Sequence, residues 1–152
     1  FCPVDKLIRA EINVSLGTDG AASNNSQDMF GEMSTAALVA KAVSGDASAV
    51  SAHQALEMAT INGARALGWD DQIGSIETGK SADLIAVELG AVESEPLYNL
   101  SSQLVYTNAG GRVSHLWVNG EALMKQRQLQ TLNEQEILTK ARQWQKKIAK
   151  SP

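Results

Sequence analysis

The chain has 152 residues, of which 43% are apolar and 20% charged, and its net charge is -4. This composition is typical of a globular protein, and the length suits one ordinary domain or parts of two. The acidic balance argues against a nucleic-acid surface, and no apolar run approaches the roughly 20 residues that a membrane span needs. Cys2 is the sole cysteine. It allows neither an internal disulfide nor a cysteine-based zinc site, and it suits the reducing cytoplasm, where we place the protein.

Residues 12–16 alternate apolar and small polar side chains, which is the period of a β-strand. Continued along the chain, this alternation puts Asp19 on the same face as Asn13 and Ser15, just past the end of the strand. A carboxylate at the C-terminal tip of a strand is where an α/β barrel keeps its catalytic groups. The alternative is that Asp19 only caps the following turn, and the spacing alone favours neither role.

Helices are expected after this strand, because apolar residues recur there at helical spacing. The first helix follows a cap at Asn25 and ends near Gly45. Its methionines are expected in the core rather than in a ligand site. The second helix opens at Ser51, with Gln54 at the capping-box position. A short helical turn over 62–68 comes next and ends on a glycine.

Strands are expected in the middle of the chain. Residues 83–87 form an apolar run typical of a buried strand, and a second strand covers 113–118. The dipeptide Asn119-Gly120 predicts a tight hairpin, because both of its positions need positive φ. The return strand is expected over 121–124.

The remaining segments are predicted to be a long loop over 90–111 and a last amphipathic helix that begins near 131–134. A parallel strand such as 12–17 needs neighbours on both sides, and nothing later in the chain is a clean candidate. We therefore expect parts of two domains, each of which lacks partners.

Three stretches resemble the amidohydrolase superfamily. They are Gly-Thr-Asp-Gly-Ala-Ala-Ser-Asn-Asn at 17–25, Ala-Thr-Ile-Asn-Gly-Ala-Arg-Ala-Leu-Gly at 59–68, and the glycine-punctuated run into a strand at 73–87. Val118 and the Asn-Gly pair after it agree with the same pattern. The resemblance is to the chlorohydrolase and aminohydrolase branch, which includes S-adenosylhomocysteine and 5-methylthioadenosine deaminases.

The resemblance implies an α/β fold, namely the C-terminal part of a (β/α)8 metal-dependent hydrolase barrel, part of a small β-sandwich domain and a C-terminal helix. Residues 1–68 would be the last strand and following helices of the barrel. Residues 69–130 would be the C-terminal strands of the composite β-sandwich, and 131–152 the amphipathic helix. Since only the C-terminal third of such an enzyme is matched, an N-terminal part is expected, covalently attached or as a separate chain.

The resemblance also implies a metal site. In the family a divalent metal, usually zinc, is held by a His-x-His pair and further histidines, and an aspartate on the last strand completes the site. Asp19 matches that aspartate, as metal ligand and catalytic residue. His53 and His115 stand in no such motif. Ser23 and Asn24, in the loop beyond, are expected to bind substrate, the alternative being that this loop only sets up the turn and helix cap.

Two acids in the predicted helices, Glu32 and Glu57, are expected to be solvated rather than catalytic. A hydrolytic deaminase must attack a C–N carbon with hydroxide, and a divalent metal achieves this by lowering the pKa of water to about 7. Asp19 is suited to contact the metal, to accept the proton and to pass it to the leaving amine.

The expected function is therefore that of part of a metal-dependent hydrolytic deaminase acting on an adenosine-type nucleoside, such as S-adenosylhomocysteine or 5-methylthioadenosine. The chain alone is expected to be inactive. The alternatives are a guanine deaminase or a triazine or chloro-hydrolase of the same superfamily, or a non-catalytic binding or assembly module if the chain is a natural stand-alone product. The expected partners are a small nucleoside and further copies of the protein, without nucleic acid or membrane.

Overall fold

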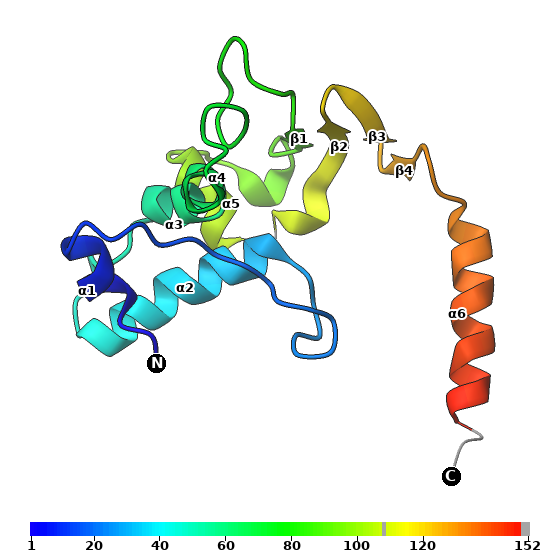
Figure 1. The fold of residues 1–152 in the computed structure, drawn as a ribbon, viewed down its shortest axis with the longest axis horizontal. Helices are drawn as coiled ribbons and strands as arrows, with labels where there is room; N and C mark the ends of the chain where they lie inside the picture. The colour runs from blue at the N-terminus through cyan, green and yellow to red at the C-terminus, as the bar shows by residue number, and fades with distance from the viewer. Residues whose placement is uncertain (108, 150–152) are drawn as a thin grey trace.

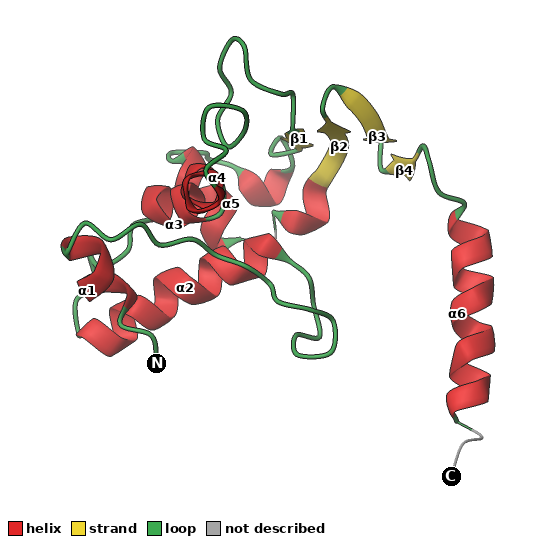
Figure 2. Ribbon diagram, in the orientation of Figure 1, coloured by secondary structure: helices red, strands yellow, loops and turns green. Residues whose placement is uncertain are grey.

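A computed structural model describes residues 1–107 and 109–149 (Figure 1). Helices and a small antiparallel sheet form a mixed α/β arrangement, and the last helix stands apart from the rest (Figure 2). The helical elements are α1 Val4–Arg9, α2 Met29–Ser44, α3 Ala52–Met58, α4 Ile61–Leu67, η1 Val92–Ser94, α5 Leu100–Tyr106, η2 Gly110–Arg112 and α6 Glu134–Ile148. The strands are β1 Leu84–Val87, β2 Val113–Val118, β3 Glu121–Lys125 and β4 Gln128–Leu129.

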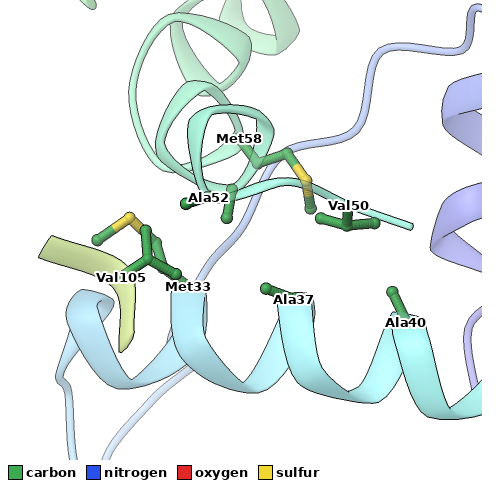
Figure 3. Packing of buried hydrophobic residues seen from close by; sticks show 8 residues of the cluster. Met33, Ala37, Ala40, Val50, Ala52, Met58 and Val105 are labelled. Carbon is green, nitrogen blue, oxygen red and sulfur yellow. The ribbon is translucent and has the colours of Figure 1, made fainter. Parts of the chain in front are cut away.

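The core lies where α2, α3 and α5 meet, and small side chains let the helices approach closely there (Figure 3). Met58 of α3 and Val105 of α5 are its largest fully buried side chains. Alanines fill much of the remaining contact. The buried cluster is Met33, Ala37, Ala40, Val50, Ala52, Ala55, Met58 and Val105.

The helix boundaries follow the local capping signals, with one correction. The capping box of Ser51 and Gln54 is present in both directions, as predicted. Gly45 ends α2 in a left-handed conformation, also as predicted. The cap of α2, however, is Asp28 and not Asn25, because the Asp28 side chain accepts from the amide of Phe30 and so satisfies a free donor of the first turn.

The segment over 12–17 is extended but pairs with no strand among the described residues, so its strand assignment stays a prediction. The backbone of Leu16 donates to the carbonyl of Met58 at 2.9 Å, and the carbonyl of Val14 accepts from the Asn62 side chain at 3.1 Å. These partners belong to helix ends, whereas a strand needs a neighbouring strand's backbone. The expected alternation is present over 14–16, where Val14 and Leu16 pack against the core and Ser15 is exposed, but Ile12 is 53% exposed.

The sheet has the order β1-β2-β3-β4, with all neighbours antiparallel. The predicted hairpin is confirmed: Asn119 and Gly120 join β2 to β3 with φ of 49° and 78°. β1 is only partly buried, with Ile85 half exposed, so the expectation of a buried strand is wrong for the described chain. Strand β4 extends the sheet beyond what the sequence predicted.

The segment 90–111 is not the predicted loop. It contains η1, α5 and η2, and α5 is capped by Asn99, whose side chain accepts from the amide of Ser102 at 2.8 Å. Burial of Val105 against α2 and α3 stabilises this helix, a tertiary contact that local sequence patterns do not reveal.

The two ends of the chain are helical. Helix α1, which the sequence analysis did not anticipate, precedes the extended segment. Helix α6 begins after the cap Asn133, as expected, and has no buried residue. The predicted helical segment 131–152 ends outside the described residues. Within the part that is described, no helix is both long and apolar enough to cross a membrane.

Candidate functional site

Asp19 lies at the end of the extended segment, in a backbone conformation that few residues other than glycine adopt. Its φ is 57°, in the left-handed region that aspartate tolerates better than bulkier residues do. The carboxylate is held on both oxygens: Oδ1 accepts from the amide of Gly20 at 2.8 Å, and Oδ2 accepts from the hydroxyl of Ser23 at 2.7 Å. Two donors of its own loop therefore hold the carboxylate.

The same two hydrogen bonds favour the ionised form of the carboxylate. The Ser23 hydroxyl and then the Gly20 amide lower the pKa of Asp19 below its ordinary value, because both donors favour the charged form. Asp19 is exposed. Each of its carboxylate oxygens accepts one hydrogen bond and keeps a further lone pair for another partner. An anionic, oriented and accessible carboxylate is suited to a divalent cation.

Asn24 links the Asp19 loop to helix α2. Its side-chain amide donates to the carbonyl of Thr18 at 2.9 Å and to Oε1 of Glu32 at 2.7 Å, and its Oδ1 accepts from the amide of Ser26 at 3.0 Å. The backbone amides of Ser23 and Asn24 both donate to the carbonyl of Gly20 at 3.0 Å. The loop is thus a closed hydrogen-bonded unit around Asp19.

The structure therefore brings all three predicted site residues into one network, Ser23 by a direct bond to Asp19 and Asn24 through the backbone of Thr18. Glu32 also belongs to this network, although its sequence context gives no sign of it. The expectation that Glu32 is merely solvated is wrong, because it is half-buried and accepts from Asn24. A single acid in the first turn of a helix gives no sequence signal of a partner eight positions away.

Histidines contribute nothing to this loop among the described contacts. His53 is exposed on α3, and its Nε2 lies 3.7 Å from the carboxylate of Glu57. His115 on β2 has Nδ1 3.0 Å from the Ser114 hydroxyl and stacks on Trp117. Over residues 1–107 and 109–149, no three His, Cys, Asp or Glu side chains gather as a metal site. Asp19 therefore fits a divalent metal as one ligand, and the described chain does not supply a complete site.

A hollow of about 470 Å³ lies elsewhere, between α1 and the second half of α2. Val4 and Arg9 line it from one side and Val43 from the other. The Asp19 loop takes no part in this hollow, so its volume says nothing about the candidate site.

The chain is similar to proteins of one family. Residues 1–123 match the amidohydrolase family. The 5-methylthioadenosine/S-adenosylhomocysteine deaminase of Teredinibacter turnerae is 54% identical over 147 residues, which are 97% of this chain and 33% of that protein. The protein of the same name from Saccharophagus degradans is 49% identical, with the same coverage of 97% and 33%.

Solved structures agree with the sequence relatives. An adenosine deaminase from Xanthomonas campestris with bound zinc superposes with a TM-score of 0.95 at 47% identity, over 99% of this chain and 34% of that one. Atrazine chlorohydrolase from Arthrobacter aurescens, complexed with zinc, superposes with a TM-score of 0.85 at 28% identity, over 93% of this chain and 32% of that one. The chain thus spans about a third of the length of these proteins.

The motif at 17–25, which carries the resemblance, forms a single hydrogen-bonded loop around an ionised carboxylate. The family match covers more than half of the chain, and the superpositions extend the likeness to the fold. The predicted resemblance is confirmed, and the chain belongs to the amidohydrolase family.

Proposed function

We propose that this chain works as part of a zinc-dependent hydrolytic deaminase whose substrate is an adenosine-type nucleoside, S-adenosylhomocysteine or 5-methylthioadenosine. The observation that carries the proposal is the Asp19 carboxylate, ionised and held on both oxygens in the motif shared with the family. Relatives named as deaminases of these two nucleosides, at 54% and 49% identity, support the substrate class.

Asp19 is proposed to be both metal ligand and catalytic residue. When bound, zinc would lower the pKa of water and so make a nucleophile available near neutral pH. The carboxylate of Asp19 would hold the metal, take up the proton of the attacking water and return it to the departing amine. Its lowered pKa supports the first role, because the ligand must be ionised before the metal binds.

Ser23 and Asn24 are proposed to bind substrate as acceptors. The single hydroxyl hydrogen of Ser23 is donated to Asp19, and both amide hydrogens of Asn24 are donated within the protein. What remains free is acceptor capacity on Ser23 Oγ and Asn24 Oδ1. Ribose hydroxyls or the exocyclic amine of the base are donors that match this capacity.

We propose the corresponding architecture from the family likeness. Residues 1–68 would complete a (β/α)8, or TIM, barrel with their extended segment as its last strand. Residues 69–130 would add strands to a β-sandwich, and 131–152 would form the closing helix. Val14 and Leu16 are partly buried against the core, and this segment has no strand partner in the described chain; both observations support the barrel assignment.

The remaining proposals concern partners and compartment. An N-terminal part, covalent or separate, would supply the other metal ligands, which is supported by the third of its relatives' length that the chain spans. The exposed free thiol of Cys2 suits the cytoplasm. A homo-oligomer is proposed on the family resemblance, with light scattering as its test.

The test is a deamination assay on the complete enzyme and on the 152-residue chain alone. S-adenosylhomocysteine and 5-methylthioadenosine should release ammonia with the complete enzyme and not with the isolated chain. Guanine and atrazine are assayed as alternative substrates, and atrazine is included because a chlorohydrolase is also structurally similar. Preference for either one would replace the nucleoside assignment, and turnover by the isolated chain would contradict the need for an N-terminal part.

A further inference from the structure

Glu32 lies in the first turn of α2 and directs its carboxylate at the Asp19 loop. The side-chain nitrogen of Asn24 donates to Glu32 Oε1 at 2.7 Å and to the carbonyl of Thr18 at 2.9 Å. The two hydrogens of one amide group therefore join helix α2 to the peptide that directly precedes Asp19. A carboxylate acceptor makes this hydrogen bond stronger than a neutral acceptor would.

Helix α2 is a firm support for such a link. Met33, the neighbour of Glu32, is 3% exposed, and Ala37 one turn later is fully buried against the core. The negative charge of Glu32 is also favoured at this end of the helix by the peptide dipoles. The acceptor is thus placed by the packed core and not by the loop that it holds.

Asp19 needs such support because its own backbone is unfavourable. A left-handed φ of 57° costs energy even for aspartate, and surrounding contacts help to hold it. The contacts after Asp19 come from its own loop, through Gly20 and Ser23. The contact directly before it, at the carbonyl of Thr18, leads through Asn24 to helix α2.

We propose that Glu32 is a positioning residue that acts through Asn24. It fixes the Thr18–Asp19 peptide and thereby the direction in which the Asp19 carboxylate meets its metal. The proposal rests on the proposed function for the metal at Asp19 and adds a residue outside the family motif to that site. Removing a residue that holds a metal ligand in position typically weakens metal binding by about 10- to 100-fold.

The test measures zinc affinity by competition with a chelator and the visible absorption of the cobalt-substituted complete enzyme. Glu32→Ala should weaken zinc binding by about tenfold or more and shift the cobalt band. Glu32→Gln keeps an acceptor oxygen and should retain both properties. Glu57→Ala is the matched control, because Glu57 is a half-exposed helix acid paired only weakly with His53, and it should change neither.

Unchanged zinc affinity and an unchanged cobalt band in Glu32→Ala would overturn the proposal, even if the melting temperature fell. An equal loss in Glu57→Ala would overturn it too, since any helix acid would then have the same effect. If Glu32→Ala does not fold, Glu32→Asp decides, because its shortened carboxylate should lose the bond to Asn24. Zinc binding without deamination would reject only the proposed function, whereas an enzyme that binds no zinc would reject both.

Discussion

Serine hydroxyls close to an exposed carboxylate recur in this chain. Ser23 donates to Asp19 at 2.7 Å, and Ser48 donates to Asp46 through its hydroxyl at 2.6 Å and its amide at 2.8 Å. Each contact lowers the pKa of the acid, with a smaller contribution from Arg9 in the case of Asp46. A short polar turn therefore lowers the pKa of an exposed acid without burying it.

Asp46 allows this effect to be measured away from the candidate site. Ser48→Ala should raise the pKa of Asp46 toward its ordinary value, followed by carbon NMR titration of the carboxyl group. Because the folded pKa is lowered, Asp46 stabilises the fold above its ordinary pKa and loses that contribution as pH falls through the lowered one. The variant should therefore lose less stability on acidification.

Ser48→Thr keeps the hydroxyl and is the matched control for this titration. An Asp46 carboxyl that titrates identically in the wild type and in Ser48→Ala would show that the hydroxyl hydrogen bond at 2.6 Å does not lower its pKa.

At the same scale, the sequence draws attention to Asp19 but not to Glu32, and the role of Asp19 stays a prediction. Asp19 stands in a contiguous motif whose glycines and serine are all within a few positions, so its resemblance to the family is readable. Glu32 acts only through Asn24 across a loop, and that contact exists only once α2 is packed. The roles of Ser23 and Asn24 as substrate contacts stay predictions.

Among the elements, those defined by local chemistry were predictable. The capping box at Ser51 and the Asn119-Gly120 hairpin each depend on residues within three positions of one another. The segment 12–17 and helix α5 depend on distant parts of the chain. For segment 12–17, the sequence periodicity predicts which side chains face the core but not which backbone groups they bond. For α5, no local sequence pattern predicts that Val105 is buried.

The capping box gives a local prediction for α3. Ser51→Ala should remove the side-chain acceptor for the Gln54 amide and cost about 1 kcal/mol of helix stability, about a fivefold change in the opening equilibrium. Hydrogen exchange of the α3 amides should accelerate by that factor. Ser51→Asp retains a capping acceptor and should keep near-normal exchange, and equal acceleration in both variants would contradict the cap's role.

A glycine pair tests the packing between α4 and the segment after it. Gly74 has φ of 88°, and a Cβ there would lie 2.7 Å from the Ala64 Cβ and 3.0 Å from the Ile61 Cα. Gly45 has φ of 69° with nothing within 4 Å. Gly45→Ala should cost about 1–2 kcal/mol from backbone strain alone.

Gly74→Ala should cost about 1–3 kcal/mol more than that, because overpacking is added to strain. Urea denaturation of the two variants measures the difference in unfolding free energy. Equal destabilisation would mean that the loop around Gly74 moves away freely and is not fixed against α4.

The whole molecule presents apolar surface that the described residues leave uncovered. Helix α6 exposes one apolar face along its length and stands clear of the rest of the described chain (Figure 1). Ile76 and Val92, in the segments beside the sheet, are 87% and 89% exposed. The exposed apolar residues of α6 are Ile137, Leu138, Trp144 and Ile148.

Such extensive apolar exposure marks surfaces that contact other protein. It agrees with a chain that spans about a third of its relatives' length. The domain division at residues 68 and 130 stays a prediction. Sequence patterns predict many helices and strands of this chain, but they do not predict what packs against the exposed apolar faces.

The two proposed roles of Asp19, metal ligand and catalytic residue, are measured together by kcat/KM for S-adenosylhomocysteine and by the bound zinc of the complete enzyme. Asp19→Ala should lower kcat/KM by about a hundredfold or more and reduce the zinc content, because the ligand and the proton acceptor are lost together. Turnover at the wild-type rate with a full complement of zinc in Asp19→Ala would contradict the account.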